Sequence, residues 1–440
     1  MISLHQSQER MRSRPTICII SFSPIARDAR VLRQINHLAP HYDLVVLGYG
    51  APPQRWRNVE GVRWFSVDSP RWYEMQHLKA LLVAGRVWRP STCYELWYWL
   101  QRLYRQAFEQ LRHTRIDLVF ANDWSALPLG WRLSARWHAP LILDLHEYAP
   151  LEWEEQWKWR LFAAPMTVYF LRKYAIHADA TLTVAPEIAQ RYSEEFGFLP
   201  TVVLNAPEYV TVEDHAVNPQ TVRMLHHGSA LRARALESMI DTLRLCDQRY
   251  HLSFMLVGDE GYIQHLRAYA DRVAPGRVEF LDPVAPDQVV PRIASFDMGI
   301  YLLQPTNYNN SIALPNKLFD FTHAGLAVCV GPSPGMSAFV REWQCGVVAP
   351  SFDPAEVAGT LNRPAATTSR QCAAPRASLP PGSMRPPKCQ RLLNCAIACF
   401  SARRRQGEGK ARGKRGGAGG KVEGGRWKVA LPLRAPSCPW

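Results

Sequence analysis

The sequence predicts an α/β fold of two Rossmann-like domains, each built on a parallel β-sheet, and three observations support this. Short apolar runs alternate with longer segments whose apolar residues recur at the helical period, which is typical of strand–helix–strand units. The alternation begins near residue 16, stops in a polar stretch and then starts again. The 440 residues are also too many for one ordinary hydrophobic core.

The N-terminal domain is expected over residues 16–207, after a disordered start at residues 1–15. A helix after the first strand places Val31, Ile35 and Leu38 on one apolar face. The strands are expected, in chain order, at residues 16–22, 42–49, 117–123, 140–148, 180–186 and 201–207. The clearest helices are expected at residues 26–39 and 159–178.

A tryptophan-rich segment interrupts this first series. Twelve of the 15 tryptophans lie between Trp56 and Trp159, mixed with Tyr, Arg and Leu on stretches of helical length. Such a surface suits a bilayer interface, where aromatic and basic side chains lie at headgroup level. Core packing of a helical insertion explains the same residues, so both interpretations stay open.

A linker is expected at residues 208–221, followed by the C-terminal domain over residues 222–362. A helix is expected at residues 233–246, directly after the first strand of this domain. The strands are expected at residues 222–228, 251–260, 278–284, 298–304, 326–331 and 346–350.

The segment ALPNKLFDFTHAGLAVCVG, which starts at Ala313, combines a helix start with charged residues. Pro315 is expected at the first helical position, where its missing N–H costs nothing. Lys317 and Asp320 are three residues apart and therefore share a face. First-turn N–H groups, the helix dipole and the ammonium form an anion site, and the carboxylate one turn later accepts hydroxyl hydrogen bonds. This pattern predicts a nucleotide cradle; the alternative is a surface Lys/Asp pair.

The amino-acid composition and charge of the chain change after a helix that is expected to start at Asp353. Asp353 is the expected N-cap, Pro354 the first helical residue and Glu356 the partner in a capping box. From Arg363 onward there are 17 Lys and Arg against two acids, so the net charge of +14 arises there and the rest of the chain is nearly neutral. A basic nucleic-acid-binding surface on the folded part is therefore not expected.

Residues 363–440 are expected to form a disordered basic tail, because they are rich in Pro and Gly and have no long apolar stripe. Their composition is also typical of a GC-rich gene read in a shifted frame. The alternative is a genuine basic arm that binds nucleic acid or anionic lipid.

The five cysteines before Arg363 are scattered and form no CxxC pair, which predicts free thiols, and we expect no metal site. We find no signal peptide and no apolar stretch of the ~20 residues that a spanning helix needs. A cytoplasmic location is expected.

Several motifs in register resemble glycosyltransferase family 4, a group of GT-B enzymes. They are RDARVLRQINHLAPHYDLVVLG, LILDLHEYAP, HHGSALRARALESMI, VGDEGY, FDMGIYLLQ and the segment from Ala313. The resemblance covers residues 16–362 and implies two Rossmann-like domains facing across a cleft. The C-terminal domain would hold a nucleotide-sugar donor and the N-terminal domain a glycan or lipid-linked acceptor.

The resemblance further implies a retaining, metal-independent transferase with no cofactor beyond its nucleotide-sugar co-substrate. Its expected role is in cell-surface polysaccharide or glycolipid synthesis, with peripheral contact to the inner membrane surface.

The resemblance also assigns residues to the donor site. Asp320 stands where the family has a ribose-binding Glu, and Ile312 stands where a second Glu is usual. Lys317, with Arg232 or Arg234, corresponds to the cations that bind the diphosphate and stabilise it as a leaving group. A solvated helix-start residue is the alternative for Arg234.

The remaining assignments concern strand ends and turns. His146 corresponds to a cleft histidine that contacts the donor sugar; the alternative is a hydrogen-bonded edge histidine. Gly258 and Asp259 are expected to border the nucleobase or ribose, unless they form a simple tight turn. Gly228 and Asn316 complete the expected nucleotide-binding set.

Three other functions were weighed. A dinucleotide-dependent oxidoreductase is disfavoured because no GxGxxG motif follows either opening strand. A sugar-nucleotide epimerase of the same fold would use the same nucleotide cradle. A non-enzymatic binder of nucleic acid or anionic lipid rests on the charge of the tail alone.

Overall fold

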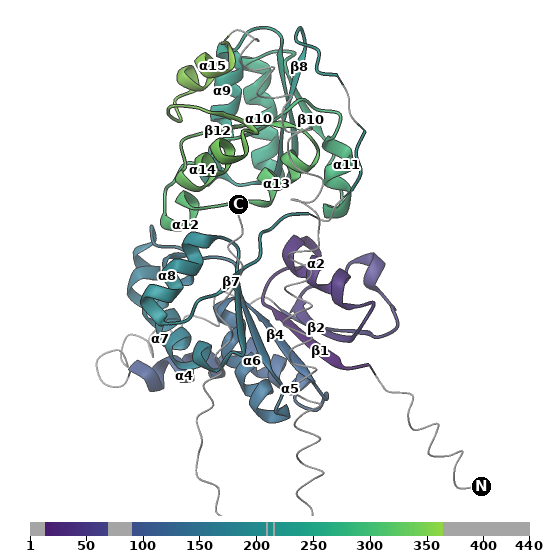
Figure 1. The fold of residues 1–440 in the computed structure, drawn as a ribbon, viewed down its shortest axis with the longest axis vertical. Helices are drawn as coiled ribbons and strands as arrows, with labels where there is room; N and C mark the ends of the chain where they lie inside the picture. The colour runs from purple at the N-terminus through teal and green to yellow at the C-terminus, as the bar shows by residue number, and fades with distance from the viewer. Residues whose placement is uncertain (1–13, 69–89, 208–209, 214–215, 364–440) are drawn as a thin grey trace, which may run out of the picture. The chain divides into compact units, whose positions relative to one another are not determined.

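The computed structural model describes residues 14–68, 90–207, 210–213 and 216–363, and it contains two parallel sheets (Figure 1). The first sheet has the order β3-β2-β1-β4-β5-β6-β7. Its central strands β1, β2 and β4 are nearly continuous apolar runs because helices cover both faces. The strands of this sheet are β1 (Thr16–Ser21), β2 (Asp43–Tyr49), β3 (Val62–Val67), β4 (Leu118–Asn122), β5 (Leu141–Leu145), β6 (Ala180–Thr183) and β7 (Thr201–Val202).

The helices of this domain begin close to the expected positions. Helix α2 starts at Ala29, because the Asp28 carboxylate accepts hydrogen bonds from the N–H groups of Arg30 and Val31 and so caps it. The helices are α2 (Ala29–Leu38), α4 (Pro90–Leu100), α5 (Arg102–Leu111), α6 (Asp123–Trp137), α7 (Ala164–Tyr174) and α8 (Pro186–Phe196). Short helical turns are η1 (Ile25–Arg27), η2 (Gln54–Trp56), η3 (Ala149–Leu151), the π-helical η4 (Trp159–Ala163) and η5 (Ala175–His177).

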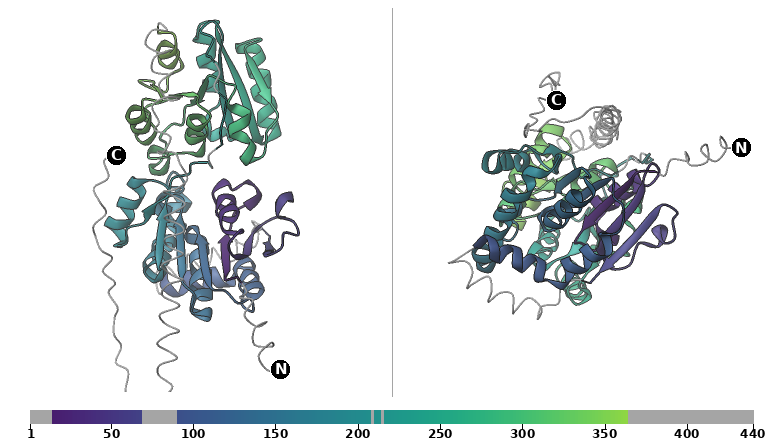
Figure 2. Two further views of the ribbon diagram at one scale, coloured as in Figure 1. Left: turned by 45° about the vertical axis from the view of Figure 1, so that its right-hand side comes forward. Right: turned by 90° about the horizontal axis from the view of Figure 1, so that it is seen from below.

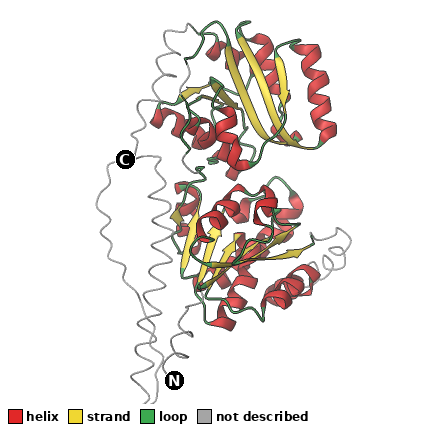
Figure 3. Ribbon diagram, turned by 90° about the vertical axis from the view of Figure 1, so that its right-hand side faces the viewer, coloured by secondary structure: helices red, strands yellow, loops and turns green. Residues whose placement is uncertain are grey.

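The second sheet has the order β10-β9-β8-β11-β12-β13. Its strands are β8 (Val222–Ala230), β9 (Tyr250–Gly258), β10 (Val278–Leu281), β11 (Met298–Tyr301), β12 (Ala327–Val330) and β13 (Gly346–Val348). The helices are α9 (Glu237–Leu245), α10 (Glu260–Val273), α11 (Val289–Ile293), α12 (Tyr308–Ser311), α13 (Asn316–His323), α14 (Pro334–Trp343) and α15 (Pro354–Leu361), with the turns η6 (Arg232–Arg234) and η7 (Pro286–Gln288). In each domain helices flank the sheet (Figures 2 and 3).

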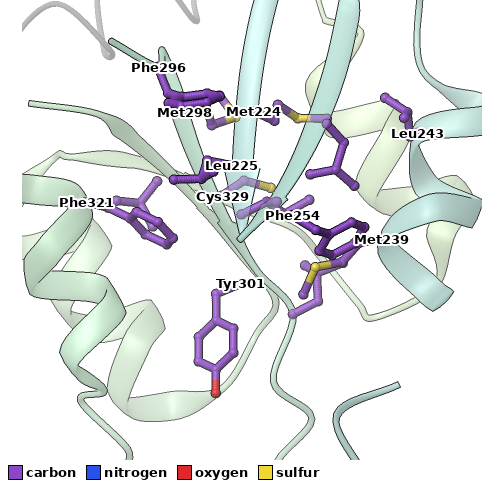
Figure 4. Close-up of a cluster of buried hydrophobic side chains, with 14 of the residues drawn as sticks. Met224, Leu225, Met239, Leu243, Phe254, Phe296, Met298, Tyr301, Phe321 and Cys329 are labelled. Atoms are coloured by element: carbon purple, nitrogen blue, oxygen red, sulfur yellow. The ribbon is translucent and has the colours of Figure 1, made fainter. Parts of the chain in front are cut away.

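The core of the C-terminal domain lies between its sheet and the flanking helices (Figure 4). Met224, Phe254 and Cys329 come from three different strands and are fully or almost fully buried, and Phe321 of α13 packs into the same cluster. Tyr301 lies at the border of this cluster, with its hydroxyl directed away from the other labelled side chains (Figure 4). The apolar face of α13 thereby fixes where its polar face lies.

Helix α13 differs from the prediction in two ways. Pro315 is the N-cap, with φ −72° and ψ 153°, so the helix begins one residue later than expected. An extended proline suits this position because it donates no hydrogen bond. Lys317 is only 8% exposed, so the interpretation of a surface Lys/Asp pair is wrong.

The expected capping box at α15 is also wrong in one half. Asp353 accepts hydrogen bonds from the N–H groups of Ala355 and Glu356, as predicted. Its own N–H donates to the hydroxyl of Ser351, where the capping box would use the Glu356 side chain. The predictions for residues 1–13 and for the tail from residue 364 lie outside the described residues, as does part of the linker.

The tryptophan-rich segment packs mainly into the N-terminal core over its described part. Trp97 is 8% exposed, and Trp99 packs against the same cluster and over the guanidinium of Arg132. For these two residues core packing is the correct interpretation. Trp153 and Trp157, in contrast, are exposed. Across the described ranges, no helix combines the length and apolar character needed to cross a bilayer. The five described cysteines are buried free thiols, as expected.

Candidate functional site

The carboxyl end of β8 meets the first turn of α13 at Gly228. This glycine has φ +113°, a conformation that side chains rarely adopt, and a β-carbon there would lie 2.7 Å from Nζ of Lys317. The ammonium therefore rests directly against the backbone of β8. Only a glycine leaves this space open.

Lys317 is a buried cation held by an aromatic ring. Its Nζ lies 4.8 Å from the centroid of the Tyr301 ring, a cation–π contact that stabilises the ammonium. Burial and the nearby positive charge of Arg234 lower the pKa of Lys317 to about 7. Among the ion pairs of the described residues, none involves Lys317, so its charge is available to an anionic ligand.

Asp320 lies one turn further along α13. Its Oδ2 is 3.5 Å from Nε2 of His227, and its side chain is 13% exposed. Burial raises the pKa of Asp320 to about 7, against the attraction of nearby cations. Burial, and then the charge of Lys317, lower the pKa of His227 to about 3, so His227 is a neutral imidazole.

One cavity brings these groups together. From the C-terminal domain its lining includes His227, Gly228, Arg234, Tyr301, Asn316, Lys317 and Asp320. Within the described part of the chain, Nε2 of His227 and Oδ1 of Asn316 are buried without a hydrogen-bond partner. Unsatisfied buried polar atoms that line a cavity indicate a ligand site. The arrangement offers cations to a diphosphate and a carboxylate to hydroxyl groups.

Five of the predicted donor-site residues, Gly228, Arg234, Asn316, Lys317 and Asp320, line this cavity. Arg234 also donates from Nη1 to the carbonyl of Ser229, which fixes its guanidinium at the end of β8.

Three of the predicted nucleotide-binding residues, all in the C-terminal domain, do not line the cavity. Arg232 instead lies over the ring of Tyr262, with Cζ 4.7 Å from its centroid. Gly258 ends β9, and Asp259 is the N-cap of α10, where it accepts from the N–H groups of Gly261 and Tyr262. The structure thus gives Asp259 a capping role.

His146 follows β5 at the carboxyl edge of the first sheet. Its Nδ1 lies 3.2 Å from Oδ2 of Asp123, and its Nε2 lies 3.3 Å from Oδ1 of Asn122 and 3.7 Å from Oδ2 of Asp144. Burial alone would lower the pKa of His146, but the two carboxylates outweigh it and raise the pKa to about 9. Both ring nitrogens face oxygen atoms of the same domain, and the raised pKa favours the protonated ring.

Asp144 connects His146 to α2. Arg30 binds this carboxylate bidentately, with Nε 2.7 Å from Oδ2 and Nη2 2.6 Å from Oδ1. Gln34, one turn along α2, donates to both Asp144 and Asn122. Burial would raise the pKa of Asp144, but Arg30 and His146 together hold it below its usual range. The network is fully satisfied, which rigidifies this edge of the sheet.

Asp123 sits in a strained position beside His146. It has φ +64° at the first turn of α6, and its Oδ1 accepts the backbone N–H of His146 at 3.0 Å. Aspartate tolerates this conformation better than most residues. The backbone carbonyl of Glu147, the next residue, accepts a hydrogen bond from the Tyr192 hydroxyl.

The partners of the predicted residues were not predicted from the sequence. Arg30 and Gln34 were recognisable as polar residues one turn apart, and Asp144 as a carboxylate two residues before His146. His227 and Tyr301 were not singled out, because a histidine or tyrosine inside a strand does not by itself indicate which cavity it lines. In the described part of the chain, no cluster of three His, Cys, Asp or Glu side chains has an arrangement that would hold a metal ion.

Comparisons with known proteins agree with this description. Residues 28–206 match the model of a glycosyl transferase 4-like domain, and residues 221–365 match that of glycosyl transferases group 1. No curated protein sequence is significantly similar to the chain.

Solved structures share the fold at low identity. HepE from Anabaena, in complex with UDP and glucose, has a TM-score of 0.61 and 16% identity, over 88% of this chain and 100% of HepE. Sucrose-phosphate synthase from Thermosynechococcus elongatus has a TM-score of 0.59 and 11% identity, over 90% and 100%. A Listeria monocytogenes structure assigned as UDP-N-acetylglucosamine 2-epimerase has a TM-score of 0.56 and 10% identity, over 89% and 98%. With the two family models covering most of the chain, the protein is a glycosyltransferase of the GT-B fold.

Proposed function

We propose that this glycosyltransferase takes a sugar from a nucleoside-diphosphate sugar and transfers it, with retention and without a metal ion, to a hydroxyl of a glycan or lipid-linked acceptor. One observation carries the proposal. Lys317 is a buried ammonium without an ion-pair partner among the described residues, and Asp320 lies one turn further along the same helix. A cation followed by a carboxylate fits a diphosphate followed by a ribose.

The residues of the cavity supply the chemistry expected at a leaving group. Negative charge develops on the nucleoside diphosphate as the glycosidic bond breaks. Lys317, Arg234 and the first N–H groups of α13 would stabilise that charge without reorganisation, because they are already fixed by packing. These cations would replace a divalent metal, which supports the proposal of metal independence.

UDP is the first nucleotide to test, because HepE, a structural neighbour, binds UDP and glucose. Retention rests on the resemblance to glycosyltransferase family 4. In support of it, the carboxylates near His146 are engaged, Asp144 by Arg30 and Asp123 by His146, so neither is an unconstrained base.

The acceptor is proposed to belong to cell-surface polysaccharide or glycolipid synthesis, with the enzyme cytoplasmic and in peripheral contact with the inner membrane surface. The exposed indoles of Trp153 and Trp157, next to Lys158, suit such a contact. Co-sedimentation with anionic vesicles tests this part separately from the chemistry.

A sugar-nucleotide epimerase remains the second candidate, because the Listeria neighbour shares the fold. The two reactions differ in their need for an acceptor. A transferase releases stoichiometric nucleoside diphosphate only when an acceptor is present, whereas an epimerase converts its substrate without one.

The first experiment is a thermal-shift screen of UDP-, GDP- and ADP-sugars against the wild-type chain and the Lys317→Met variant. Ligand at about 100 times its Kd adds about 2.7 kcal/mol of stability. One sugar nucleotide should stabilise the wild type, and Lys317→Met should reduce the effect to about half or less. Product analysis by NMR then gives the anomeric configuration, and chelator should leave the rate unchanged. Stabilisation of both proteins alike would refute the site.

A further inference from the structure

His227 is the donor-cavity side chain that neither the motifs nor the expected chemistry assigns. Its Nε2 is buried and has no hydrogen-bond partner among the described residues, and the residue belongs to the lining of the cavity. The ring is held edge-to-face against Phe321, with centroids 5.2 Å apart. The nitrogen is therefore fixed in place and unsatisfied, although an oxygen of Asp320 lies 3.5 Å away.

The protonation state of this pair defines what it recognises. With its pKa lowered to about 3, His227 is neutral and has one N–H and one bare nitrogen. Beside a carboxylate oxygen, the favourable tautomer carries the proton on Nε2. No direct hydrogen bond joins the two groups, and a hydroxyl that bridges Nε2 of His227 and Oδ2 of Asp320 would satisfy both. That hydroxyl would accept from Nε2–H and donate to Oδ2 of Asp320.

We propose that His227 and Asp320 form a two-point clamp for one ribose hydroxyl of the bound donor, and that this clamp selects ribonucleotides over deoxyribonucleotides. The inference rests on the proposed function, because it needs a nucleotide in this cavity. It adds a specificity residue on β8 to the carboxylate on α13. A deoxy analogue would leave both buried partners unsatisfied, which is how a hydrogen-bonding site rejects a ligand without the hydroxyl.

Calorimetry on the full chain tests the clamp. The probes are whichever of UDP, GDP and ADP binds the wild type, and its 2′-deoxy and 3′-deoxy forms. We expect at least one deoxy form to bind the wild type at least about tenfold more weakly. In His227→Phe, which keeps an aromatic ring but removes the N–H, the ratio of the Kd of the deoxy form to that of the ribonucleotide should fall towards one. His227→Gln, which restores an N–H donor, should recover part of it.

His265→Phe is the matched control, because His265 lies on α10, pairs with Glu237 and does not line the cavity. It should keep the wild-type ratio. Equal affinity of the wild type for all three forms, or an unchanged ratio in folded His227→Phe, would refute the clamp and leave the donor site standing. If none of the three diphosphates binds the wild type, the proposed function and the clamp both fall. If His227→Phe does not fold, His227→Leu, which also removes the N–H, replaces it, and the preference for the ribonucleotide should likewise disappear.

Discussion

The side chain of Lys317 packs directly against the backbone of Gly228: a β-carbon on residue 228 would lie 2.7 Å from Nζ of Lys317 and 3.0 Å from its Cε. Two segments 89 positions apart thus meet without any side chain between them. The close approach brings a cation to the carboxyl end of β8, where open α/β sheets bind their ligands.

Gly228→Ala should therefore weaken nucleoside-diphosphate binding by about tenfold or more, because the ammonium has to move and a charge-assisted hydrogen bond contributes roughly 1.5–3 kcal/mol. The strained φ of +113° should also lower the free energy of unfolding by about 1–3 kcal/mol. Calorimetry and chemical denaturation measure the two effects. Gly197→Ala is the control, since Gly197 has φ +75° but open space around it. Normal nucleoside-diphosphate affinity in Gly228→Ala would show that the contact between Gly228 and Lys317 does not position the ammonium for binding.

Nucleotide-sugar affinity should depend on pH, with a maximum near pH 7. Lys317, with a pKa of about 7, loses its positive charge as the pH rises above that value, and the diphosphate then loses its cation. Asp320, also with a pKa of about 7, is protonated as the pH falls below it and accepts ribose hydroxyls less well. Affinity should therefore decline on both sides.

Two variants separate the decline in affinity above pH 7 from the decline below it in calorimetric titrations. Lys317→Met should bind about tenfold or more weakly and show no further decline above pH 7. Asp320→Asn should show no decline in affinity below pH 7. Asp320→Ala should bind about tenfold more weakly while the fold survives. A decline in affinity above pH 7 that persists in Lys317→Met would show that another group causes it.

His146 should make the free energy of unfolding pH-dependent between about pH 6.5 and 9. Its pKa is raised from 6.5 to about 9 in the folded state, so its stabilising contribution is complete below pH 6.5 and is lost as the pH rises through 9. Denaturation at several pH values should show this decline, and His146→Asn should flatten it. A decline of equal size in the variant would show that His146 is not its source.

A substitution at His146 should also affect turnover without affecting nucleotide binding. His146→Ala should lower the transfer rate and leave the affinity for the bare nucleoside diphosphate unchanged, because His146 belongs to the other domain's sheet edge. Loss of both in a folded variant would place it in the nucleotide site or the scaffold.

Arg30→Met should destabilise the N-terminal domain by about 3–5 kcal/mol, because it leaves the buried Asp144 carboxylate without its main partner. Chemical denaturation measures the loss. Arg55→Met, which removes an exposed ion pair with Asp287, should change stability by less than about 1 kcal/mol. Similar values for both variants would argue against the buried network.

Trp97→Ala should lower the free energy of unfolding by about 3–5 kcal/mol, as expected for a large buried aromatic side chain. Trp157→Ala, at a 56% exposed position, should stay within about 0.5 kcal/mol of the wild type. A stable Trp97→Ala variant that no longer sediments with anionic vesicles would instead favour a membrane role for Trp97.

Much of the fold was predictable because its signals are local. Apolar runs marked β1, β2, β8 and β9 to within a few residues, and Asp353 marked the start of α15. Strand β3, Val62–Val67, was missed because exposed residues interrupt its apolar pattern. The capping partner of Asp353 was wrong because Ser351, two residues before it, and Glu356, three residues after it, are both near in sequence and only geometry chooses between them.

The sequence by itself determined the alternation of strands and helices, the polar face of α13 and the cation and carboxylate on it, because periodicity and helix starts depend on neighbouring residues. Only the tertiary structure decided that Lys317 is buried, that Arg30 meets Asp144 across 114 positions and that His227 faces Asp320. Strand order places β1 between β2 and β4, and β8 between β9 and β11, so segments far apart in sequence become neighbours. Burial and charge pairing follow from that neighbourhood, and they set the protonation of each group at the site.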